Sequence, residues 1–66
     1  MKKVYIAMIE RSNIGKAILG NSERMVYFTS RKAAQNFINH LDVYEEGYID
    51  TENVTEEVYV KIDFCA

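Results

Sequence analysis

The sequence predicts a two-layer α+β fold in which a single helix packs on one face of a mostly antiparallel four-stranded sheet. Three patterns support this prediction: an apolar run at Val4–Ile9, an apolar stripe with helical spacing near the middle, and alternating apolar and polar residues over 58–64. Runs and period-two alternation are typical of strands, whereas the stripe is typical of a helix that faces a core on one side. The expected element order is β-β-β-α-β.

Three strands are expected in the first half of the chain. Val4–Ile9 is a continuous apolar run rich in β-branched residues, and a turn-like segment of small and polar residues follows it. Lys16–Leu19 and Met25–Phe28 are two shorter apolar runs, each ending at residues typical of turns. Two hairpins are the simplest arrangement of these three strands.

One helix is expected at roughly 30–42, because Thr29 or Ser30 can cap its first turn. Its apolar residues fall at the i, i+3, i+4, i+7 spacing of one helical face. They are Ala34, Phe37, Ile38 and Leu41. The opposite face of this helix is polar, so we expect it to cover the sheet with one side only.

The final third of the chain is predicted to be a loop followed by a strand. The segment 42–57 contains seven acids and no Lys or Arg, and its apolar residues are too sparse to set a period. Val58, Val60, Ile62 and Phe64 then alternate with polar or amphipathic residues, as in a strand with one buried face. We expect these four residues to lie beneath the helix.

The length of 66 residues limits the chain to a single domain, 1–66, with one small core. Such a core leaves little net stability, so a bound partner or self-association is expected. Cys65 is the only cysteine and cannot form an internal disulfide. The first apolar run stops at Glu10, too short for a secretory or membrane-spanning segment, so a cytoplasmic protein without membrane contact is expected.

The charge of the chain is divided unevenly. Residues 1–32 contain seven Lys/Arg and two Glu, a net +5, whereas residues 33–66 contain one Lys and eight acids, a net −7. Acids grouped on one surface can attract a basic protein and accelerate its approach. The expected acidic surface consists of Asp42, Glu45, Glu46, Asp50, Glu52, Glu56 and Glu57. A solvated loop that balances the basic half is the simpler alternative.

The sheet face opposite the helix is predicted to be an aromatic contact surface. Its expected contact residues are Tyr5, Ile9, Tyr27 and Tyr59. This assignment leaves open which side of the first strand faces the helix, because both sides are mostly apolar. A homodimer that packs sheet to sheet is expected to cover such a face, and a second protein docking there is the alternative. Single-stranded nucleic acid could also stack on the tyrosines, but the net charge of −2 disfavours phosphate binding.

A weaker anion site is suggested where Arg24, Ser30, Arg31 and Lys32 gather near the expected helix start. Solvated side chains, or pairing with the acidic segment, would equally explain these basic residues. We expect no metal, no cofactor and no catalysis. One His, one Cys and surface acids provide neither a nucleophile with its base nor a metal ligand set.

The sequence therefore indicates a small non-enzymatic protein-binding module, either a regulator or an inhibitor. In size and acidity the chain is comparable to the DNA-mimicking inhibitors of phages and mobile elements, although no motif supports this comparison. A single-stranded nucleic-acid-binding protein and a purely structural, self-associating subunit are the alternatives. The identity of the partner, the pathway, the host and the strand order do not follow from the sequence.

Overall fold

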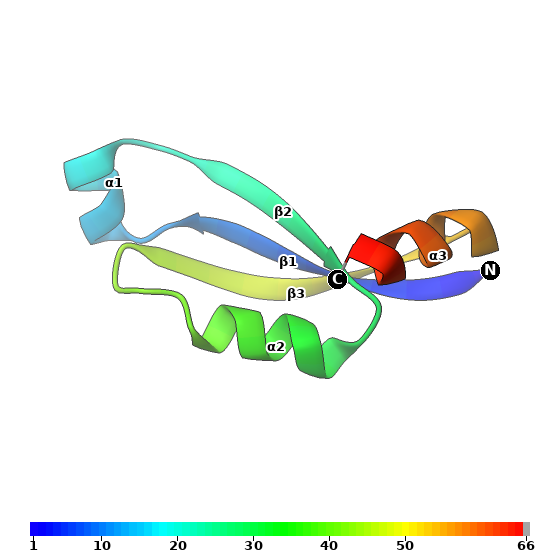
Figure 1. Ribbon diagram of the computed structural model, residues 1–66. Helices are drawn as coiled ribbons and strands as arrows, with labels where there is room; N and C mark the ends of the chain where they lie inside the picture. Colours follow the sequence, from blue (N-terminus) through cyan, green and yellow to red (C-terminus); the bar gives the residue numbers. More distant parts are fainter. Residues whose placement is uncertain (66) are drawn as a thin grey trace.

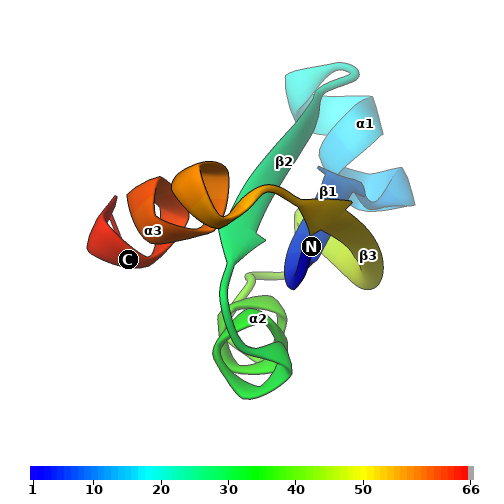
Figure 2. The same cartoon turned by 90° about the vertical axis from the view of Figure 1, so that its right-hand side faces the viewer.

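A computed structural model describes residues 1–65, which form one antiparallel sheet of three strands together with three helices. The elements in chain order are β1 (Lys2–Arg11), α1 (Asn13–Leu19), β2 (Glu23–Phe28), α2 (Arg31–Asn39), β3 (Glu45–Val54) and α3 (Glu56–Cys65). β1 lies between β2 and β3, and α2 and α3 lie on opposite faces of the sheet (Figures 1 and 2). The α+β class is confirmed, whereas the four-stranded sheet with a single helix is wrong.

β1 is buried on both of its faces. It pairs with β2 and with β3 in unbroken antiparallel registers, so even-numbered β1 residues point to one face and odd-numbered residues to the other. Val4 and Ile6 on the even side and Ala7 and Ile9 on the odd side are all at most 5% exposed. A helix on each face explains why both sides of this strand are apolar.

α2 covers the odd-numbered side of β1, close to where the sequence places its helix. The Ser30 side chain caps this helix by accepting a hydrogen bond from the Ala33 N–H at 3.1 Å. Ala34 is fully buried, and the ring centroids of Phe37 and Phe28 lie 5.5 Å apart. The expected helix over 30–42 is therefore confirmed, although the observed helix ends at Asn39.

The predicted strand Lys16–Leu19 is instead part of helix α1. The Ser12 hydroxyl caps this helix by accepting the Gly15 N–H at 3.2 Å, and Gly20, with a φ of 83°, ends it. Gly15 is required because a Cβ there would overlap the carbonyl oxygen of Tyr44. The run contains only three apolar residues, Ala17, Ile18 and Leu19, which are too few to distinguish a helix from a strand.

The predicted acidic loop 42–57 contains a ten-residue edge strand, β3. β3 pairs with β1 along its whole length, from Lys2 opposite Val54 to Arg11 opposite Glu45. β3 is paired along one edge only, and most of its residues are exposed to solvent. Its sequence therefore needs few apolar residues. Charged side chains are typical of edge strands because they prevent pairing with other chains.

The predicted strand Val58–Phe64 is helix α3. The Thr55 hydroxyl accepts the Val58 N–H at 3.3 Å, and Glu56 and Glu57 occupy the first turn, where negative charge favours a helix. Tyr59 and Ile62 are half-buried, whereas Val58, Val60 and Phe64 are exposed. The four alternating residues therefore do not lie beneath α2.

Within residues 1–65, no helix combines the length and apolar character needed to cross a membrane.

We expect alanine substitutions on the half-buried face of α3 to reduce stability more than substitutions on its exposed face. Tyr59→Ala and Ile62→Ala should each lower the free energy of unfolding by about 1–2 kcal/mol, because both side chains are half-buried. At a protein concentration low enough to keep the chain monomeric, Val60→Ala and Phe64→Ala should change it by less than about 0.5 kcal/mol, because both are exposed. Urea unfolding measures all four. Equal losses for Val60→Ala and Ile62→Ala would contradict the helix, since a strand would place both on one buried face.

Candidate functional site: the open sheet face

α3 covers only one end of the sheet face on which it packs. There, the ammonium nitrogen of Lys2 lies 5.4 Å from the centroid of the Tyr59 ring, and the Thr29 hydroxyl donates to Asp63 at 2.9 Å. Val4 and Ile6, beneath this end, are buried. Farther along β1, toward Glu10, no helix of residues 1–65 covers the same face (Figures 1 and 2). We call this uncovered half the open face.

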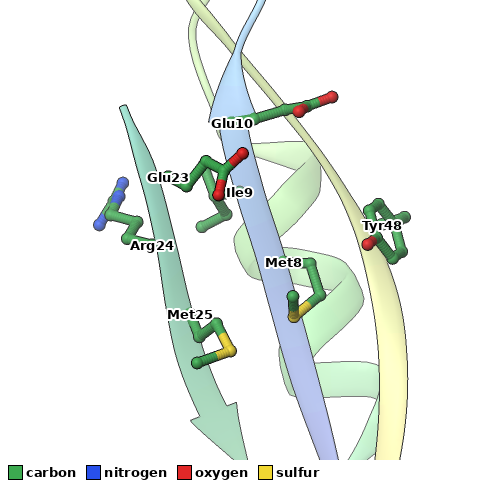
Figure 3. A pocket seen from close by; sticks show the side chains of 7 residues that line it. All are labelled: Met8, Ile9, Glu10, Glu23, Arg24, Met25 and Tyr48. Carbon is green, nitrogen blue, oxygen red and sulfur yellow. The ribbon is translucent and has the colours of Figure 1, made fainter. Parts of the chain in front are cut away.

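The open face has an apolar floor built from all three strands. Met8 of β1 lies opposite Met25 of β2 and Tyr48 of β3 in the registers, so the three side chains share one face. Tyr27 adjoins them beside α3. Met25 is 56% exposed and Tyr48 61% exposed, which is unusual for large apolar side chains that neighbour one another. A groove of about 310 Å³ runs between them (Figure 3).

Carboxylates border this floor. Glu23, Glu10 and Glu46 lie opposite one another on three adjacent strands and form a row at the α1 end of the open face. Asp50 and Glu52 of β3 point to the same side of the sheet. Among residues 1–65, none of these five acids forms an ion pair. Like charges placed directly opposite one another in a sheet are destabilising, so the row lowers the stability of the isolated domain.

Few basic side chains lie on this side of the sheet, and one of them, Lys16 of α1, lines a hollow beside Glu10 and Glu23. Among the described strand residues that point there, Lys2 is the one cation, and it lies at the far end, 3.9 Å from Glu56 of α3. Arg24 borders the groove, but its guanidinium points away from it (Figure 3), above the Phe37 ring and 3.4 Å from Glu45. The open face is therefore apolar at its centre and negative at its border.

The structure does not bring the four expected contact residues onto one sheet face. Tyr5 and Ile9 point to the α2 side, where the Arg31 guanidinium lies 5.2 Å from the Tyr5 ring. Tyr27 adjoins the open face, and Tyr59 belongs to α3. The sequence leaves open which side of β1 faces α2, and the contacts of Phe37 with Phe28 and of Arg31 with Tyr5 decide it. That these residues contact a partner stays a prediction.

Sequence reasoning missed three residues of the floor, namely Met8, Met25 and Tyr48. The apolar runs place Met8 and Met25 in strands without assigning them to a contact surface, and the acidic composition of 42–57 predicts a loop at Tyr48. The signal for Tyr48 was the Glu46–Tyr48–Asp50 spacing, which puts alternate residues on one side of an extended chain.

The seven expected acids do not form one surface. Glu46, Asp50 and Glu52 point to the same side of β3 as the open face. The remaining four lie apart from it: Asp42 in the turn before β3, Glu45 on the α2 side, and Glu56 and Glu57 in the first turn of α3. Two acids that the sequence did not assign to the surface, Glu10 and Glu23, complete the border instead.

The residues of the suggested anion site are also dispersed. Ser30 uses its hydroxyl to cap α2, and Arg31 lies over the Tyr5 ring. Arg24 is bound to Glu45 near the Phe37 side of α2, away from the start of the helix. Lys32 is exposed.

Within residues 1–65, no three His, Cys, Asp or Glu side chains are close enough together to hold a metal ion.

We expect Glu10→Gln to stabilise the domain, because Glu10 lies between Glu23 and Glu46. The free energy of unfolding at low salt should rise by about 0.5 kcal/mol, and the gain should shrink at high salt. Urea titration at two salt concentrations measures the effect. Glu57→Gln is the control, because Glu57 lies 3.5 Å from Lys61 and its loss should not stabilise. A destabilised Glu10→Gln protein would contradict repulsion within the row.

Comparison of this chain with protein-family models, with curated proteins and with solved structures finds no match. The side chains of the described residues and their arrangement are therefore the basis for the function proposed below.

Proposed function

We propose that this protein is a small non-enzymatic protein-binding module that receives its partner on the open face. The observation that supports this proposal best is the unequal covering of one sheet face. α3 buries Val4 and Ile6 at one end, while Met25 and Tyr48 at the other end are more than half exposed. Adjoining apolar side chains that remain exposed mark interaction surfaces in proteins.

The composition of the open face favours a protein partner. Methionine adapts to different shapes and tyrosine presents a large contact area, and both are enriched at protein interfaces. The surrounding carboxylates can attract a basic partner and orient it. The same carboxylates would repel the phosphates of single-stranded nucleic acid, so stacking of bases on Tyr27 and Tyr48 is the less favourable alternative.

Site-specific photo-cross-linking tests this proposal in the cells that make the protein. A photoreactive phenylalanine analogue at Tyr48 should yield a covalent adduct with another protein. The matched control places the same analogue at Gln35, which is exposed on α2 on the other side of the sheet. Adducts at Tyr48 that disappear with Met25→Lys, and that are absent at Gln35, are the expected result.

Equal adducts at Tyr48 and Gln35, or adducts at Tyr48 that Met25→Lys leaves unchanged, would contradict binding through the open face. Met25 is more than half exposed, so Met25→Lys should leave the fold intact. Circular dichroism of the purified variant checks this.

Self-association is the second candidate, and the outer face of α3 favours it. Phe64 is 89% exposed and Val60 is 55% exposed, and these apolar side chains form a patch separate from the open face. Sheet-to-sheet packing through the open face is less favourable, because it would bring two rows of glutamates together. A dimer formed through α3 would leave the open face accessible.

Light scattering over a concentration series should therefore show a dimer that resists salt, because apolar contacts are not screened. Phe64→Lys should convert this dimer into a monomer, whereas Met25→Lys should not change the mass. A dimer disrupted only by Met25→Lys would instead show that a second copy occupies the open face. A monomer at every concentration would eliminate self-association as a function.

A further inference from the structure

We infer that the open face binds a basic amphipathic helix of about two to three turns, supplied by another protein and lying beside α3. This inference rests on the proposed function and specifies the chemistry of the partner. The helix would place an apolar stripe on Met8, Met25 and Tyr48 and direct Lys or Arg side chains toward the bordering carboxylates.

The position of the groove favours a helix over an extended segment. The groove lies on the face of the sheet, above Met8, and not along a strand edge (Figure 3). An extended segment lying on a face would bury backbone N–H and C=O groups without partners, whereas a helix satisfies its own. α3 already packs in this manner on the adjacent end of the same face, with Tyr59 and Ile62 half-buried.

The length of the open face sets the length of the helix. From Ile6, at the limit of the part that α3 covers, to Glu10 is four residues of β1, or about 13 Å of strand. A helix rises about 5.4 Å per turn, so two to three turns span this distance. A second hollow of about 420 Å³ shares Glu10 and Glu23 with the groove, and Lys16 of α1 also lines this hollow.

Charge favours a basic partner over the docking of α3 from a second copy of this chain. The open face is bordered by four acids without ion pairs among the described residues, namely the Glu23, Glu10, Glu46 row and Asp50 opposite Ile6. A cation placed over this row removes the repulsion within it. α3 of a second copy carries Glu56, Glu57 and Asp63, and would add negative charge to a surface that is already negative.

Three fluorescent fourteen-residue peptides test the inference against the full chain. The first places Leu at i, i+3, i+4 and i+7 and Lys at the flanking positions. The second has the same composition in an order without a stripe, and the third replaces Lys with Glu. Fluorescence anisotropy should show binding of the first peptide alone, at least about fivefold tighter at 50 mM than at 500 mM salt.

Two matched double variants test where on the protein the first peptide binds. The double variant Glu10→Gln with Glu23→Gln should weaken binding of the first peptide at least about fivefold, because it removes two charges that border the groove. Glu56→Gln with Glu57→Gln removes the same charge from α3 and should have no effect. Amide chemical-shift changes should be largest at Met8, Met25 and Tyr48. Equal weakening by both double variants, or equal affinity for the unstriped peptide, would overturn the inference.

The cross-linking experiment separates the two proposals. If Tyr48 yields an adduct in cells while the basic striped peptide does not bind, the protein-binding function stands and the basic helix is wrong. If neither is observed, the protein-binding function of the open face fails as well. Binding of the acidic peptide in place of the basic one would also overturn the inference.

Discussion

The burial of β1 on both faces is the constraint on which the rest of the structure depends. This strand pairs with β2 on one edge and β3 on the other, and α1, α2 and α3 all contact it. Val4, Ile6, Ala7 and Ile9 supply nearly all of the fully buried apolar core. Removing water from both sides of one strand lets a chain of this size form a core at all. Burial of both sides also requires a helix on each side of the sheet, and α2 and α3 cover their two sides unequally.

The unequal covering connects stability to function. α2 lies along the odd-numbered side of β1, whereas α3 covers only the end of the even-numbered side near Val4 and Ile6. Met8 and its neighbours on β2 and β3 are left with apolar area that the domain does not bury. The glutamates across the strands add repulsion at the same place. A domain that keeps both features gives up stability, as is common where a protein surface is kept for binding.

The short elements show how side chains fix local structure where apolar patterns do not. Ser12, Ser30 and Thr55 each cap a helix through a hydroxyl oxygen, and a glycine with positive φ ends α1. Arg11 donates to the carbonyl oxygens of Leu19 and Gly20 and so ties the end of α1 back to β1. These contacts keep α1 at the end of the groove although Ile14, Ile18 and Leu19 remain exposed.

The sequence by itself determined the two elements whose patterns are unambiguous, the apolar run of β1 and the capped stripe of α2, and it placed a strand correctly at the short run of β2. Tertiary structure decided the rest. Residues 58–64 alternate as a strand would, but Tyr59 and Ile62 also fit one side of a helix, and the uncovered face of β1 requires such a helix. β3 contains too few apolar residues to be recognised, because an edge strand is stabilised by pairing with its neighbour. The open face combines side chains from three strands, and the registers that place Met8, Met25 and Tyr48 together are long-range pairings that local patterns do not encode.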